Sequence, residues 1–150
     1  MGQLLAQMPS YIVKADVRDR RATTMSFPRM KTMYGGKYIA VSDTIFVFAS
    51  ETEGGTGLIA RGVVTKGNAV PRKRGGARQT PRVSIEVKCT ARARRPLGRA
   101  ELKAWRAVRD GSPQAELDFK LYRQATNKIV GISDAAARFL NTCFGPVDPG

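Results

Sequence analysis

Histidine is absent from this 150-residue chain, and cysteine occurs only at Cys89 and Cys143. Without histidine, neither a Ser-His-Asp nor a Cys-His catalytic centre can form. A structural zinc site needs about four Cys or His ligands, so the sequence excludes one, and we expect neither a metal nor a cofactor. Two isolated cysteines form neither a disulfide framework nor a redox motif, which predicts a reducing, cytoplasmic location.

Acidic residues are scarce as well: 12 Asp and Glu stand against 26 Lys and Arg, a formal net charge of +14. A surplus of this size indicates a polyanionic partner, with DNA or RNA as the first candidate and an anionic membrane surface as the second. No apolar run approaches the ~18 residues of a membrane span. The first residues lack the basic and apolar regions of a signal peptide, so we expect none.

The sequence does contain a series of short segments rich in apolar and β-branched residues, which is typical of strands. The predicted strands cover residues 10–16, 44–49, 57–65, 82–90, 118–123 and 128–132. Helical spacing of Leu102, Trp105 and Val108 predicts a helix over 99–109, and a second helix is expected over 134–143.

Consecutive short strands with few helices favour the α+β class. We predict a small mixed β-barrel of about five to six strands with two or three flanking helices. It forms one domain over residues 10–144, with an extension at 1–9 and a tail at 145–150. Residues 17–36 show no clear period, so they are expected to form an irregular insertion after the first strand.

The order of these segments resembles the PUA-like barrel superfamily, in particular its EVE branch and more distantly its YTH branch. The similarity covers residues 10–144 and is carried by YIVKAD, by TIFVFASETEGGTGLIARGVV and by RVSIEVKC. Asp43 to Ser50 and Gly57 to Val63 match the hallmark pair of strands well. Lys14, Ala15 and Asp16 match the family's Lys-Ser element loosely.

The resemblance implies a non-catalytic domain that binds an unpaired or modified base. The implied pocket lies between the end of the first strand, the insertion, and the loop after the second strand. Stacking on side-chain faces and hydrogen bonds to the base edge are typical of such sites. The candidate base-pocket residues are Lys14, Asp16, Phe27, Tyr34, Ser50 and Glu51. Asp16 or Glu51 would accept from an exocyclic amine, and Phe27 and Tyr34 would stack.

Two basic stretches flank the strand at 82–90, and we predict that they hold phosphates along one edge of the pocket. Their cations are Arg72, Lys73, Arg74, Arg78, Arg92, Arg94, Arg95 and Arg99.

Two other functions stay open. An ASCH-like nucleoside amidohydrolase, to which the barrel is also similar, would use Lys14 and Glu51 as a proton-transfer pair. A basic module that docks a protein or a membrane is the other alternative.

Overall fold

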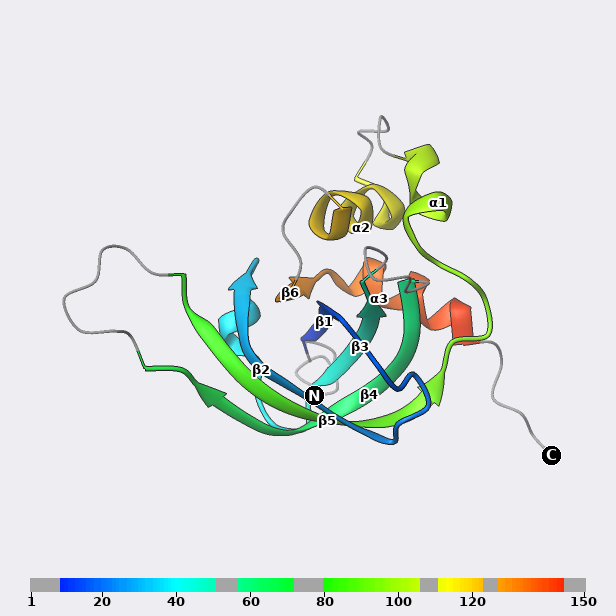
Figure 1. Cartoon of the computed structure of the whole chain (residues 1–150). Helices are drawn as coiled ribbons and strands as arrows, with labels where there is room; N and C mark the ends of the chain where they lie inside the picture. The colour runs from blue at the N-terminus through cyan, green and yellow to red at the C-terminus, as the bar shows by residue number, and fades with distance from the viewer. Residues whose placement is uncertain (1–8, 51–56, 72–79, 106–110, 123–126, 145–150) are drawn as a thin grey trace, which may run out of the picture.

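The computed structural model describes residues 9–50, 57–71, 80–105, 111–122 and 127–144, and these form a barrel covered by helices (Figure 1). The strands of this part close in the order β1-β3-β4-β5-β2-β6. The pairs β1–β3 and β2–β6 are parallel, and the others are antiparallel. The strands are β1 Ser10–Ala15, β2 Thr24–Met33, β3 Thr44–Ala49, β4 Gly57–Ala69, β5 Arg82–Arg92 and β6 Lys128–Ile132. The predicted mixed barrel of class α+β is confirmed.

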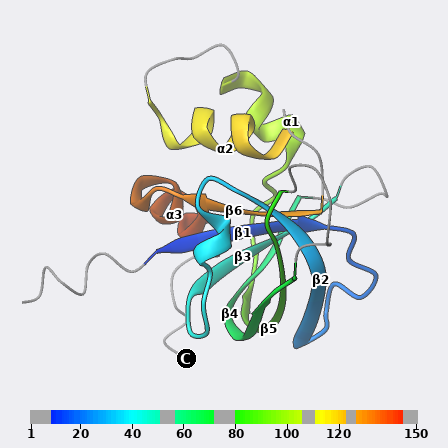
Figure 2. The ribbon, with the colours of Figure 1, turned by 90° about the vertical axis from the view of Figure 1, so that its left-hand side faces the viewer.

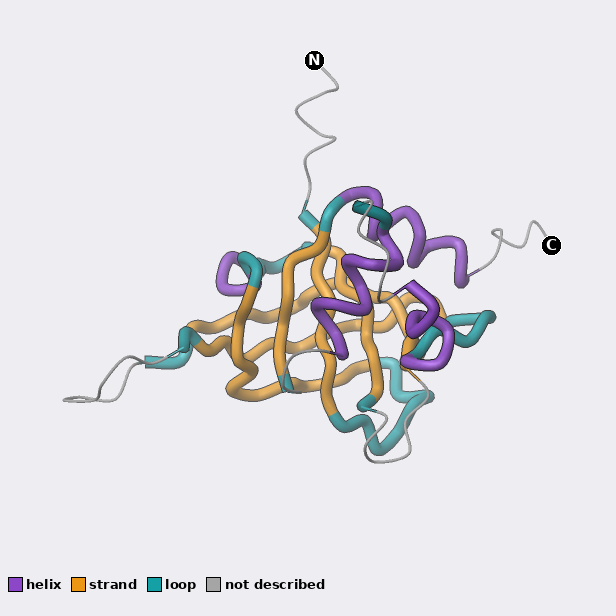
Figure 3. The backbone as a smooth tube through the Cα atoms, turned by 90° about the horizontal axis from the view of Figure 1, so that it is seen from above, coloured by secondary structure: helices purple, strands orange, loops and turns teal. Residues whose placement is uncertain are grey.

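The helices α1, α2 and α3 lie over one side of the barrel, and the short turn η2 lies apart from them (Figure 3). The helical elements are α1 Arg99–Leu102, α2 Pro113–Tyr122, α3 Asp134–Asn141 and the 3-10 turns η2 Gly36–Tyr38, η4 Lys103–Trp105 and η5 Thr142–Phe144. The helix predicted from residue 99 thus begins as α1 and continues as η4, and residues 106–110 lie outside the described part. The helix predicted at 134 begins where expected, because the Ser133 hydroxyl accepts a hydrogen bond from the Ala136 N–H.

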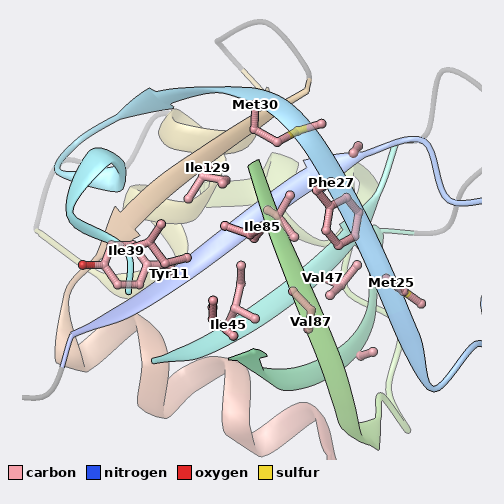
Figure 4. Close-up of a cluster of buried hydrophobic side chains, with 14 of the residues drawn as sticks. Tyr11, Met25, Phe27, Met30, Ile39, Ile45, Val47, Ile85, Val87 and Ile129 are labelled. Atoms are coloured by element: carbon pink, nitrogen blue, oxygen red, sulfur yellow. The ribbon is translucent and has the colours of Figure 1, made fainter. Parts of the chain in front are cut away.

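Two apolar clusters stabilise this arrangement. One fills the barrel, where Tyr11, Phe27 and Ile85 converge from three strands (Figure 4). The other lies between the barrel wall and the helices, and includes Phe46 and Leu121. Strands β1 and β3 contribute alternate side chains to both clusters, which explains why their sequences are apolar on both faces.

The predicted irregular insertion at 17–36 is wrong, because residues 24–33 form β2 and help to close the barrel. Met25 and Phe27 point inward, and the register with β5 then shifts before Met30. The shift coincides with Pro28, which has no N–H, and with Arg29, whose φ is +53°. This bulge changes the phase of the apolar alternation and so concealed the strand.

The predicted strand at 118–123 is also wrong, because residues 113–122 form α2. Ser112 caps the helix by accepting a hydrogen bond from the Ala115 N–H, and Pro113 occupies its first position. Leu117 and Leu121, four residues apart, are fully buried. Ser112 and Pro113 therefore start a helix ahead of the segment that was predicted to be a strand.

Gly62 lies at a register shift between β4 and β5. A Cβ atom at this position would lie 2.3 Å from the Lys88 carbonyl oxygen. The two strands thus approach more closely here than any other residue would allow.

Candidate nucleic-acid interface

Lys14 and Ser50 lie where β1 and β3 end side by side. The Ser50 N–H donates to the Ala15 carbonyl, and Ser50 is buried. Lys14 points toward α2 and is also buried; its Nζ donates to the Leu121 carbonyl at 2.8 Å and lies 4.1 Å from the centroid of the Tyr122 ring. Asp16, one residue beyond β1, is exposed. This end of the barrel therefore combines a buried amine with an exposed carboxylate.

A second lysine lies beside Lys14 and was missed from the sequence. Lys128 is the register partner of Lys14 in the β1–β6 pair and is only 1% exposed. Its Nζ has no hydrogen-bond partner in the described part of the chain. Burial, and secondarily the nearby Lys14 charge, lower the pKa of Lys128 to about 7. The only sequence signal is a lysine at the first position of an apolar strand.

Arg99 reaches the same place from α1. Its Cζ lies 5.2 Å from the Tyr122 ring centroid, so Arg99 and Lys14 contact one ring. Both cations interact with the ring's negative face at such distances. Arg99 was predicted to bind phosphate, and the structure places it next to the end of β1.

An open pocket of about 270 Å³, which we call the arginine pocket, lies at this end of the barrel. Five exposed arginines line it, and Leu58, Ile59, Ala93 and Pro96 supply the remaining wall. The arginines are Arg20, Arg21, Arg92, Arg94 and Arg95. Guanidinium groups gathered in this way are suited to bind an anion, because each carries a fork of donors whose geometry matches phosphate oxygens.

Backbone contacts place these arginines. The Asp19 carboxylate accepts from the Arg21 N–H at 3.0 Å and so closes the turn after β1. The Arg92 guanidinium donates to the carbonyls of Arg20 and Arg21, which fixes that turn against the end of β5. The N–H groups of Arg94 and Arg95 both donate to the Cys143 carbonyl, at 2.7 and 3.0 Å. Within the described residues, neither Arg94 nor Arg95 forms an ion pair.

The strand register shows that the arginine pocket lies next to the end of β1. Ala15 pairs with Ala49, and Ala49 pairs with Gly57, the residue before Leu58 in the pocket wall. In Figure 2 the blue loop that follows β1 leaves the barrel at this end. Predicted phosphate and base residues thus meet at one end of the barrel.

The predicted site residues are not all brought together. Lys14, Asp16 and Ser50 lie together where β1 and β3 end, and Arg99 contacts the same Tyr122 ring as Lys14. The other described cations of the prediction, Arg92, Arg94 and Arg95, line the adjoining arginine pocket. Glu51, Arg72, Lys73, Arg74 and Arg78 lie outside the described residues. Arg20 and Arg21 were missed, although the basic run at 18–21 is a signal that could have indicated them.

Phe27 and Tyr34 require a correction. Phe27 is 4% exposed inside the barrel, so its ring is not available to stack on a base (Figure 4). Tyr34 is exposed, but it lies at the opposite end of β1, because its carbonyl is packed against Gly131, the register partner of Tyr11.

The part of the chain that the structure describes contains no group of three or more Cys, Asp or Glu side chains that could hold a metal ion. In the same part, no helix has the length and apolarity to cross a membrane.

Neither a sequence-family model nor a curated protein matches this sequence. Solved structures do match. Human THYN1 in complex with DNA containing 5-methylcytosine superposes with a TM-score of 0.62 at 12% identity, covering 93% of this chain and 99% of that one. The DUF55 domain of human thymocyte nuclear protein 1 gives 0.62 at 14% identity, covering 91% and 98%. This chain has the DUF55 fold.

The DUF55 fold confirms the predicted EVE-like barrel as an architecture. A hypothetical protein from Leishmania major shares it, with a TM-score of 0.58, 16% identity, and coverage of 91% and 95%. A mutant ASCH protein from Zymomonas mobilis is more distant, with a TM-score of 0.50 at 11% identity over 89% and 96% of the two chains. Identities this low show the fold, and the side chains must carry the functional argument.

Proposed function

We propose that this protein is a non-catalytic nucleic-acid-binding domain that holds phosphates in the arginine pocket and takes an unpaired or modified base at the end of β1. The arginine pocket is the observation that carries the proposal. Its five arginines are exposed, and two of them, Arg94 and Arg95, form no ion pair with a described residue. The regularly spaced phosphate groups of a nucleic-acid strand are a polyanion that such a cluster of arginines can bind.

The base would lie between the arginine pocket and the ends of β1 and β3. Asp16 is exposed there and would accept a hydrogen bond from an exocyclic amine, and Arg99 and Tyr122 would border the base from α1 and α2. The matching THYN1 structure contains DNA with 5-methylcytosine. That neighbour supports a base of this kind as the first ligand to test.

A salt titration tests the proposal. We expect wild-type protein to bind fluorescent single-stranded and duplex oligonucleotides, with log K falling linearly with log salt by about 0.7 and about 0.9 per phosphate contact. A single strand with 5-methylcytosine should bind more tightly than its unmodified counterpart. Fluorescence anisotropy measures all three affinities. Absent or salt-independent binding would contradict phosphate recognition, and equal affinity for both single strands would contradict the methylated base.

A second candidate function is hydrolysis of acylated nucleosides, which the Zymomonas mobilis ASCH neighbour and the buried Lys14 favour. We expect no turnover, because Lys14 Nζ is engaged by the Leu121 carbonyl and the Tyr122 ring. Chromatography of acylated nucleosides incubated with the protein measures it. Turnover that Lys14→Met abolishes, and that the exposed-site control Lys88→Met retains, would replace the binding proposal with an enzyme.

A further inference from the structure

The surface at the opposite end of β1 carries exposed aromatic rings. Among the described residues, the exposed large hydrophobic side chains are Tyr34, Tyr38, Val41 and Phe119, with exposed fractions of 41, 70, 56 and 45%. Tyr34 and Tyr38 line a pocket of about 340 Å³, and the Tyr34 and Phe119 rings meet edge to face with centroids 6.3 Å apart. We call Tyr34, Tyr38 and Phe119 the aromatic patch. Figure 2 shows η2, in cyan, beside β1 on this side.

The backbone holds Tyr34 in a conformation that a bulky residue rarely adopts. Its φ is +52°, and Gly35 follows at +83°. The turn is pressed against β6, since a Cβ on Gly131 would lie 2.3 Å from the Tyr34 carbonyl oxygen. Strain of this kind persists where surrounding contacts impose it, and it concentrates at binding sites. The fold therefore bears a cost that keeps a tyrosine ring at the surface.

Amines accompany the rings. Lys37 Nζ lies 5.1 Å from the Tyr38 ring centroid, and Lys120 Nζ lies 4.9 Å from that of Tyr34. Lys120 is held there by the Glu116 carboxylate at 3.0 Å and the Gly131 carbonyl at 2.8 Å. Exposed aromatic faces beside cations are the combination with which proteins bind single-stranded nucleic acids, because every base has a face that stacks.

We propose that the aromatic patch is a second nucleic-acid contact, which stacks an unpaired base of the strand whose phosphates occupy the arginine pocket. The inference rests on the proposed function. The six residues of β1 separate the two places by about 17 Å at ~3.3 Å per residue, a span that a few nucleotides cover. A net charge of +14 on each chain opposes a second copy as the occupant and favours a polyanion. Bases in a duplex are already stacked, so the patch selects single strands.

The variant Tyr38→Ala tests the patch, with Val41→Ala as a matched control that removes an exposed apolar side chain without a ring. Binding is measured by anisotropy with oligothymidine, with an abasic strand of equal length, and with a duplex. We expect Tyr38→Ala to weaken oligothymidine binding about tenfold, to leave the abasic strand and the duplex unchanged, and to leave the salt slope unchanged. Val41→Ala should bind all three as wild type does.

If Tyr38→Ala lost as much affinity for the abasic strand as for oligothymidine, or lost none for any strand, the stacking proposal would be overturned. The proposed function would still stand if wild type bound oligonucleotides in a salt-dependent way. Binding of no oligonucleotide by wild type would overturn both. A concentration-dependent dimer in sedimentation that Tyr38→Ala dissolves would assign the patch to a second copy instead. Photocrosslinking of wild type with a 5-iodouracil strand gives a readout without a variant. An adduct on Tyr34, Tyr38 or Phe119 supports the proposal, and adducts only outside the aromatic patch overturn it.

Discussion

Replacing Arg94 and Arg95 together with glutamine should weaken binding to a single-stranded oligonucleotide by about a hundredfold. A hydrogen bond to a charged group contributes about 1.5–3 kcal/mol net, and a factor of ten in affinity corresponds to about 1.4 kcal/mol. Two lost contacts near the lower end of that range give the expected factor. Anisotropy at physiological salt measures it.

The same double variant should reduce the salt dependence, because two phosphates would no longer be neutralised. For a single strand, the slope of log K against log salt should become shallower by about 1.4. Both side chains are exposed and only their backbone N–H groups bind the Cys143 carbonyl, so the melting temperature should not change. Arg92 would be a poor choice, since its guanidinium also holds the turn at Arg20 and Arg21.

Arg138→Gln provides the matched control. Arg138 is exposed on α3 and does not line the arginine pocket, so its loss removes one unit of net charge without removing a pocket contact. We expect a small change in affinity. The single variants Arg94→Gln and Arg95→Gln each remove the same charge as Arg138→Gln. If all three lost affinity equally, overall charge, and not the pocket, would determine binding.

The fold was largely predictable where one periodicity continued through a segment. The strands at β1, β3, β5 and β6 lie within a residue or two of their predicted bounds, because each alternates or is apolar throughout. At β2, the bulge at Pro28 and Arg29 shifted the alternation partway along, so no single period was visible. At α2, the short alternation in DFKLYR outweighed the start signals at Ser112 and Pro113.

The candidate site was predictable only in part, because it depends on pairing between distant segments. The basic residues from Arg92 to Arg99 could be recognised in the sequence by their charge. Arg20 and Arg21 come close to them only because β2 closes the barrel. Once β2 is a strand, Phe27 must point inward and Tyr34 must lie at the far end of β1. A single missed strand thus accounts for both misplaced aromatics.

Burial of Lys128 beside Lys14 should destabilise the folded protein at pH 7, and a measurement of the free energy of unfolding should detect this. Its pKa is lowered to about 7 in the folded protein, by burial and then by the Lys14 charge, so between pH 7 and its ordinary value the unfolded chain binds more protons at this site. Stability must therefore rise with pH across that window. We expect the free energy of unfolding to increase by about 2–3 kcal/mol from pH 7 to pH 9, at about 1.4 kcal/mol per pH unit.

The window is limited on both sides by other groups. Burial raises the pKa of the Cys89, Cys143 and Tyr11 side chains, so above about pH 9 these groups keep protons longer in the folded protein and stability falls. Burial opposes ionisation of Glu116, but hydrogen bonds from Ser133 and Lys120 outweigh it and lower the pKa of that carboxyl. The contribution of ionised Glu116 to stability is therefore lost only when the carboxyl is protonated in acid, below the pH window considered for Lys128.

Replacing Lys128 with methionine should stabilise the protein at pH 7 by about 2–4 kcal/mol, because an unbranched apolar side chain of similar length removes a buried charge. It should also flatten the rise between pH 7 and pH 9. Urea unfolding at several pH values measures both effects, and Lys88→Met, on an exposed position of β5, is the control with no expected change in slope. A wild-type stability that is independent of pH in this window, or a slope that survives in Lys128→Met, would contradict the assignment. Lys128, whose burial destabilises the protein at pH 7, lies next to the proposed base site. Buried groups with shifted pKa values are common at functional sites, so oligonucleotide binding by Lys128→Met shows whether binding requires that amine.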